Sequence, residues 1–236
     1  LKWQVLHESL RKALGSARRV AMQYSPLNAI PYISRVDAGT IELVRSFGIE
    51  VVTSADLVQH FEAVWSPEQK AMHVTAAENV HRIIHEAFAE IARGIRAQEE
   101  VTEYSIQQFM VQRFADAAMI CDAPPIVAVN ANSANAHYSP NPTRLSPIRK
   151  GDFVLLDVWA KLKQPSSVYA DLSWTGFVGE TVPETHACIF DIVAEARDAA
   201  VNFVRGKVAA GESFRGAEVD DVSRAVIIQA GYEDQF

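Results

Sequence analysis

The first 65 residues alternate two kinds of apolar pattern. Residues 1–14 carry apolar side chains three or four positions apart, and residues 37–48 repeat this spacing between a capping Asp and a terminating Gly. Both patterns predict amphipathic helices. Residues 19–23 and 49–53 are short apolar runs of the kind found in strands. The order helix, strand, helix, strand predicts an α/β unit with some parallel pairing.

A much longer helical pattern follows. Ser66 and Pro67 are a typical cap and first helical residue, so we predict a helix from there to about Gln98. Its apolar stripe consists of Val80, Ile83, Ile84, Phe88, Ile91 and Ile95. A second helix is expected from Thr102 to about Ile120, where Pro124 and Pro125 end the segment.

The remaining pattern predicts three strands and then two helices. Strands are expected at 126–129, 152–160 and 168–178, and the loop 161–167 makes the last two a hairpin. Residues 130–141 are rich in Asn, Ser and Pro and predict a loop. The final helices are expected from Pro183 to Gly211, where the glycine marks the end, and at 217–230, where Gly231 follows. The sequence therefore predicts an α/β (α+β) fold.

Composition narrows the classes of partner. The chain carries a formal net charge of -7, which argues against nucleic acid because phosphate binding needs a basic face. No apolar run reaches the length of a membrane span, so we expect no membrane partner. Cys121 and Cys188 are expected to be buried free thiols in a reducing, cytoplasmic compartment. The chain begins with Leu rather than Met, so removal of a leader stays open.

The candidate chemistry lies in three residues, His137, Asp157 and Asp171. An ionised carboxylate in an apolar strand is costly unless a cation or hydrogen-bond donors compensate it. Strand alternation places Asp157 on the face of Phe153 and Leu155, and a hairpin can bring Asp171 to that face. Two adjacent carboxylates favour a divalent ion, and Mn²⁺, Co²⁺, Fe²⁺ and Zn²⁺ suit such ligands. A hydrogen-bonded strand Asp without metal remains the alternative.

Four segments occur in an order that resembles the pita-bread metallopeptidases, which include Xaa-Pro aminopeptidase, prolidase, creatinase and methionine aminopeptidase. They are Thr102-Glu103, the segment 132–140 containing His137-Tyr138, the segment 151–157 (Gly-Asp-Phe-Val-Leu-Leu-Asp) and the segment 170–175. By this resemblance, residues 66–236 are the N-terminal part of the catalytic domain. Residues 1–65 resemble the C-terminal part of a creatinase-like N-terminal domain.

The resemblance implies roles for individual residues. Asp157 and Asp171 would be metal ligands, His137 a hydrogen-bond donor near the scissile bond, and Thr175 a residue that orients a ligand. The implied activity is hydrolysis of Xaa-Pro peptide bonds by a hydroxide formed on two divalent ions, Mn²⁺, Co²⁺ or Zn²⁺. The expected partners are a peptide substrate and a second copy in a homodimer.

Three departures from the family pattern matter. The loop between the two aspartates is longer than usual, and Trp174 stands where the family has Arg. The remaining family ligands, one His and two Glu, come from later segments, so we expect residues 1–236 alone to be inactive and to bind metal weakly or not at all. A non-catalytic homologue that binds a peptide or protein is the alternative, and a creatinase-like hydrolase of a small amidine is a third possibility.

The histidine pair His81 and His85, and the single His186, are weaker candidates for metal binding than the aspartates. His81 and His85 are four residues apart on a predicted helix, but the zinc-protease motif would need Glu at position 82, where the chain has Arg. Both flank the apolar stripe, which predicts a solvated surface position. His186 falls in the first turns of a helix outside any motif and is expected to be structural or on the surface.

Overall fold

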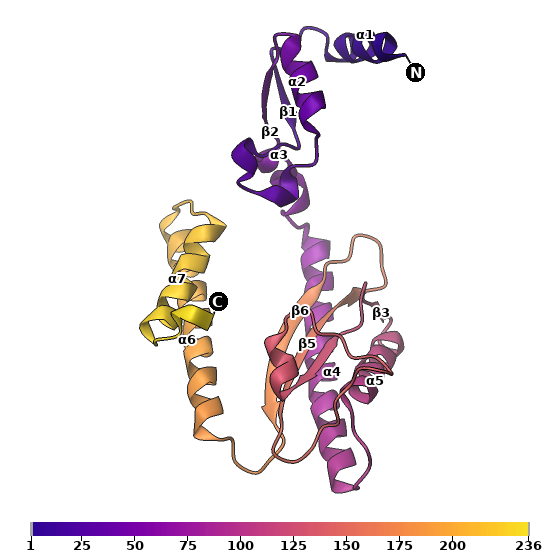
Figure 1. Ribbon diagram of the computed structural model, residues 1–236, viewed down its shortest axis with the longest axis vertical. Coiled ribbons are helices and arrows are strands. Elements are labelled where there is room, and N and C mark those ends of the chain that lie inside the picture. The colour runs from indigo at the N-terminus through magenta and orange to yellow at the C-terminus, as the bar shows by residue number, and fades with distance from the viewer. Residues whose placement is uncertain (1, 236) are drawn as a thin grey trace. The chain divides into compact units, whose positions relative to one another are not determined.

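The computed structural model describes residues 2–235 and divides into two compact units (Figure 1). The first comprises residues 1–74 with 164–168, and the second comprises residues 75–163 with 169–236. Helices and strands are mixed in both units, as the sequence predicts. In the described residues, no helix combines the length and the apolar character needed to cross a membrane.

The first unit has the predicted order of helices and strands. Strands β1 and β2 pair in parallel, with Arg19 opposite Glu50, and the core includes Ile41 and Val44. Helix α3 was not predicted; it has only eight residues, and Leu57 and Phe61 on it are exposed. The elements are α1 (Trp3–Leu14), β1 (Arg19–Met22), η1 (Pro26–Asn28), η2 (Pro31–Ile33), α2 (Ala38–Ser46), β2 (Glu50–Thr53) and α3 (Ala55–Glu62). Leu1 lies outside the described residues.

Helix α4 (Pro67–Arg96) begins where the sequence predicts. The Ser66 hydroxyl accepts a hydrogen bond from the Gln69 N–H (3.2 Å), and the Ser66 N–H donates to the Gln69 side chain (2.9 Å). This reciprocal pair satisfies two backbone donors at the start of the helix. The residues of α4 that become buried are Ala76, Val80, Ile83, Ile84, Ala87, Ile91 and Gly94.

Helix α5 (Glu103–Asp116) ends earlier than predicted. The prediction of a helix to about Ile120 was wrong, because Met119–Ile120 form strand β3. Ala118 has a φ of 51°, a left-handed conformation that interrupts a right-handed helix. Strand β3 then pairs with the end of β5, a long-range contact that no local pattern in α5 encodes.

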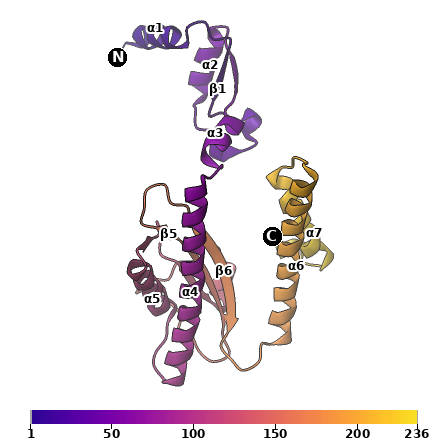
Figure 2. The same ribbon diagram turned by 180° about the vertical axis from the view of Figure 1, so that it is seen from behind.

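Strand β5 (Phe153–Leu162) is the centre of the sheet in the second unit. It pairs antiparallel with β3, with β4 (Ile126–Val129) and with β6 (Ala170–Phe177). Its even-numbered residues 154–160 are buried in a core shared with α4 and α5, and Figures 1 and 2 show α4 running along this face. The odd-numbered residues occupy the opposite face, where Leu155 and Trp159 pack in a second, smaller cluster.

The second unit ends in a helical hairpin. Helices α6 (Glu184–Ala210) and α7 (Gly216–Gln229) lie side by side (Figures 1 and 2). Gly211 ends α6 in the left-handed conformation. Cys188 on α6 is exposed, so the prediction of a buried thiol was wrong there. Nearly all of α6 is accessible to solvent, and Ala196 is the one buried residue described in this helix. Short 3-10 segments complete the unit at Asn130–Ala134 and Glu233–Gln235.

Candidate functional site

The hairpin β5–β6 places the two predicted ligands on one face of the sheet. Asp157 lies opposite Ser173, and Asp171 lies opposite Trp159. Directly paired residues of an antiparallel hairpin share a face, as do alternate residues of one strand. Asp157 and Asp171 are therefore diagonal neighbours on the face that α4 does not cover.

The two carboxylates interact electrostatically. Partial burial raises the pKa of Asp171, and the negative charge of Asp157 raises it further. The Ser173 hydroxyl donates a hydrogen bond to Asp157 Oδ1 (2.7 Å), which holds that carboxylate in place. Ser173 is not predicted by the sequence pattern, since only the strand register reveals which residue lies opposite Asp157. Thr175 lies on the same face opposite Leu155, and its role stays a prediction.

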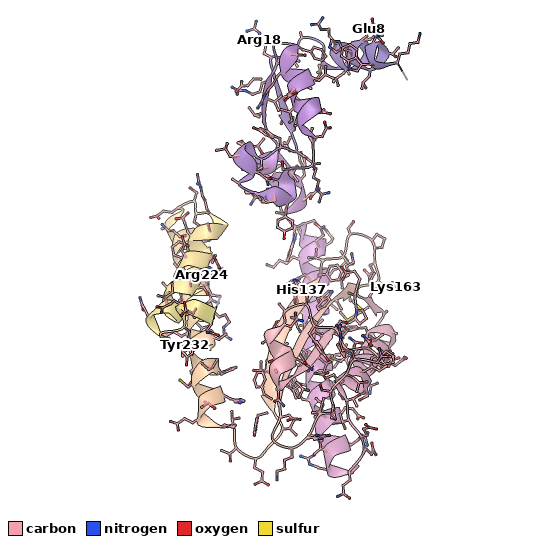
Figure 3. The ribbon with its side chains drawn as sticks, in the orientation of Figure 1. Glu8, Arg18, His137, Lys163, Arg224 and Tyr232 are labelled. Carbon is pink, nitrogen blue, oxygen red and sulfur yellow. The ribbon has the colours of Figure 1, made fainter. Side chains whose placement is uncertain are left out.

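His137 belongs to the segment between β4 and β5 and is exposed (Figure 3). Its backbone N–H donates to Asn135 Oδ1 (3.0 Å). The next residue, Tyr138, is buried in the small cluster with Ile126 and Ala128, on the face that also carries Asp157. The structure thus ties the His137 segment to the same side of the sheet as the two aspartates.

A buried carboxylate anchors this segment. Glu103, at the start of α5, is completely buried. It accepts four hydrogen bonds, from the Tyr138 hydroxyl (2.5 Å), the Ser146 N–H (2.7 Å), the Val129 N–H (2.8 Å) and the Asn132 side chain (2.9 Å). A buried charge is tolerated when its lone pairs are satisfied in this way. The sequence showed Glu103 only as part of a motif, because an acidic residue in a first helical turn is common and gives no sign of burial.

The donor set fits one part of a metal centre. Two carboxylates on one face suit a divalent cation, which would relieve the repulsion between Asp157 and Asp171. Among residues 2–235, no group of three or more His, Cys, Asp or Glu side chains is arranged to hold a metal ion. Among the described residues, Asp157 and Asp171 are therefore candidate ligands that share one sheet face.

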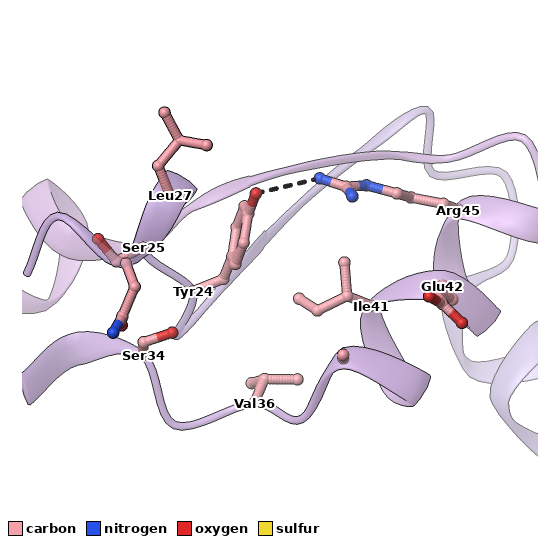
Figure 4. A pocket seen from close by; sticks show the side chains of 10 residues that line it. Tyr24, Ser25, Leu27, Ser34, Val36, Ile41, Glu42 and Arg45 are labelled. Carbon is pink, nitrogen blue, oxygen red and sulfur yellow. Dashed lines mark hydrogen bonds between the residues drawn. The ribbon is translucent and has the colours of Figure 1, made fainter. Parts of the chain in front are cut away.

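Other polar features lie elsewhere. A cavity of about 360 Å³ in the first unit is lined by residues such as Ile41, Tyr24 and Arg45, whose guanidinium donates to the Tyr24 hydroxyl (Figure 4). It contains none of the predicted site residues. Cys121 is half-buried, and burial raises the pKa of its thiol, which disfavours the nucleophilic thiolate.

The Tyr138 hydroxyl makes a testable contribution to stability at high pH. Burial and the hydrogen bond to Glu103 raise the pKa of Tyr138 to about 12, whereas an unfolded Tyr titrates near 10. The folded state retains this proton longer, so the contribution is complete below about pH 10 and is lost as the pH rises to about 12. The unfolding free energy in urea, measured from pH 8.5 to 12, should fall more steeply for the wild type than for Tyr138→Phe.

Exposed Tyr32 offers a matched control for this measurement. Tyr32→Phe should leave the wild-type slope unchanged, because its hydroxyl is solvated in both states. Equal slopes in the wild type and Tyr138→Phe would contradict the prediction.

Comparison with known proteins identifies relatives of this chain. Residues 75–236 match the sequence profile of metallopeptidase family M24. A Mycoplasma pneumoniae protein provisionally named an Xaa-Pro aminopeptidase is 29% identical over 170 residues, which cover 69% of this chain and 43% of that protein. The chain therefore spans less than half the length of this curated relative.

Two solved structures share the fold. A prolidase from Thermococcus sibiricus matches with a TM-score of 0.61 at 18% identity, covering 98% of this chain and 56% of that one. An X-Pro aminopeptidase from Thermotoga maritima matches with a TM-score of 0.59 at 21% identity, covering 98% and 58%. These likenesses confirm the expected pita-bread type of α/β fold. Together with the family match, they show that the chain belongs to metallopeptidase family M24.

Proposed function

We propose that the protein containing this chain is a metallopeptidase that hydrolyses Xaa-Pro peptide bonds, of the aminopeptidase P or prolidase type. The observation that carries the proposal is the pair Asp157 and Asp171, which share one sheet face closely enough for the charge of one to raise the pKa of the other. Membership of family M24 supports it, as do the names of the relatives, an Xaa-Pro aminopeptidase, a prolidase and an X-Pro aminopeptidase.

The residues of this chain have separate roles in the proposal. Asp157 and Asp171 present carboxylate oxygens from adjacent strands, and Ser173 keeps the Asp157 carboxylate oriented. Bound divalent ions supply a water molecule made acidic enough to act as hydroxide near neutral pH. His137 donates a hydrogen bond to the oxyanion that develops on the substrate carbonyl. Glu103 positions the His137 segment through the buried Tyr138.

We propose two divalent ions, Mn²⁺, Co²⁺ or Zn²⁺, for the intact protein. A pair of ions needs more ligands than two carboxylates, and residues 2–235 provide no group of three. Residues 1–236 alone should therefore lack peptidase activity. We further propose that residues 1–65 are the C-terminal part of a creatinase-like N-terminal domain, residues 66–236 the N-terminal part of the catalytic domain, and the whole a cytoplasmic homodimer.

The experiment uses the full-length gene product, stripped of metal with a chelator and supplied with Mn²⁺, Co²⁺ or Zn²⁺ in turn. The substrates are an Xaa-Pro dipeptide, a longer peptide with proline second, and the same peptides with alanine in place of proline. We expect metal-dependent cleavage before proline and none before alanine, and no cleavage by residues 1–236 under the same conditions. The dipeptide and the longer peptide distinguish prolidase from aminopeptidase P.

Each contrary outcome is specific. Tight binding of the proline peptide without cleavage, with every metal, would support the non-catalytic homologue. Hydrolysis of a small amidine in place of the peptides would support the creatinase-like alternative. Cleavage that persists in excess chelator would contradict the metal-dependent mechanism.

A further inference from the structure

Two histidines on α4 converge on one point outside the carboxylate site. His81 and His85 are one helical turn apart and both are exposed. Their Nε2 atoms lie 3.3 Å apart, and their ring centroids lie 4.5 Å apart with an angle of 70° between the planes. The two ring nitrogens therefore meet at a single place beside the helix.

This separation is the one that a metal ion requires. Imidazole nitrogens bind zinc at about 2.0–2.1 Å, so two of them on a tetrahedral ion lie roughly 3.3 Å apart. We propose that His81 and His85 together bind one divalent ion of the Zn²⁺, Ni²⁺ or Cu²⁺ class. Such ions favour imidazole nitrogen, whereas Mg²⁺ and Ca²⁺ favour oxygen ligands.

Trp174 of β6 limits the freedom of both rings. Its indole lies 5.2 Å from the His81 ring and 5.5 Å from the His85 ring, measured between centroids and in edge-on geometry. Because the indole blocks one side of the pair, less conformational entropy is lost when the two rings bind a common ion. The exposed side of the pair remains accessible to an ion from solvent.

The strand register separates this pair from the aspartates. Trp174 lies opposite Leu156, whose side chain is buried in the core with α4, whereas Asp157 points to the other face. The ion at His81 and His85 is thus distinct from the ions proposed for the peptidase centre. No third His, Cys, Asp or Glu joins the pair among residues 2–235, so water fills the other coordination positions.

Binding requires a change of tautomer. Without metal, the 3.3 Å contact is a hydrogen bond in which one ring carries its proton on Nε2. In the bound state both Nε2 atoms coordinate the ion, and each neutral ring carries its proton on Nδ1. The ion therefore takes the place of the shared proton and bridges successive turns of α4.

The test is calorimetric titration of the chain with Zn²⁺ and with Ni²⁺. A background with Asp157→Asn and Asp171→Asn removes the carboxylate pair, so failure of the peptidase proposal and failure of this one are distinguishable. We expect one site whose affinity falls roughly tenfold or more in His81→Gln and in His85→Gln. Gln is a good helix former, so α4 should persist in both variants. His60→Gln, which removes a single exposed histidine of α3, should bind like the background.

Tryptophan fluorescence supplies a second measurement. Cu²⁺ at the pair should quench Trp174, and this component should disappear in His81→Gln and in Trp174→Phe. The thermal midpoint should rise with Zn²⁺ in the background and not in either histidine variant, since a ligand of the folded state stabilises it. Unchanged Zn²⁺ and Ni²⁺ affinity in both histidine variants would overturn the proposal, as would the absence of binding to the background.

Discussion

Glu103→Gln is expected to lower the free energy of unfolding by roughly 3 kcal/mol. The carboxylate accepts hydrogen bonds at both oxygens, from four donors in the stretch 129–146, far from Glu103 in the sequence. A glutamine amide keeps one acceptor and turns an N–H₂ group toward the other two donors. The Tyr138 hydroxyl can rotate to accept, but the Ser146 N–H cannot. The partly buried Ser146 N–H is then left without an acceptor and faces the N–H₂ group of the glutamine.

Urea denaturation of the 236-residue chain measures this effect. Glu100→Gln is the matched control, because Glu100 is exposed and surface changes usually alter stability by less than about 0.5 kcal/mol. A loss in Glu103→Gln no larger than in Glu100→Gln would mean that the buried network contributes little. A double-mutant cycle with Tyr138→Phe isolates the part that passes through the tyrosine.

Asp157→Asn is expected to reduce kcat/KM of the full-length protein for an Xaa-Pro peptide by more than about a hundredfold. Loss of a hydrogen-bond partner of a metal ligand costs 10–100-fold, and loss of a ligand should cost more. Ser173→Ala should accordingly fall within that smaller range, since it removes the hydroxyl that donates to Asp157. Asp122→Asn should retain near-wild-type activity, because the Asp122 carboxylate is bonded to the Trp159 indole and not to the pair.

Asp157→Asn should also change the pKa of Asp171, which can be measured without metal. The charge of Asp157 contributes to the raised pKa of Asp171, so Asp157→Asn should lower that pKa toward its ordinary value. Carbon-detected NMR titration of Asp171 in residues 1–236 would show the shift. Full metal-dependent activity in Asp157→Asn would contradict the ligand assignment, and an unchanged Asp171 pKa would contradict the proximity of the two carboxylates.

Most elements of the fold follow from local patterns. The cap at Ser66, the apolar stripe of α4 and the alternation in β5 each encode one face of one element, so the predicted helices and strands are confirmed there. The helix predicted to about Ile120 was wrong because its last residues pair with a strand that is distant in the sequence. Strand β3 exists because Met119 and Ile120 meet Leu162 and Lys161, and a pattern confined to α5 cannot report that contact.

The candidate site divides in the same way. Asp157 and Asp171 stand out in sequence as carboxylates in otherwise apolar strands, and alternation predicts that they can share a face. The register places Ser173 opposite Asp157, a relation that the sequence leaves open because a shift of one residue would reverse every face. Burial of a single residue is also not given by its neighbours in the sequence, since Cys188 is exposed although apolar residues adjoin it.

The sequence by itself determined most of the helices and strands, the family resemblance and the two carboxylates, because periodicity and ordered motifs are properties of short segments. Only the tertiary structure decided that Glu103 is a buried anchor, that Ser173 holds Asp157, and that Trp174 packs against His81 and His85. The hydrogen bonds to Glu103 join residues 26 to 43 positions apart. Such contacts depend on how separate elements pack, and that packing is a property of the folded chain as a whole.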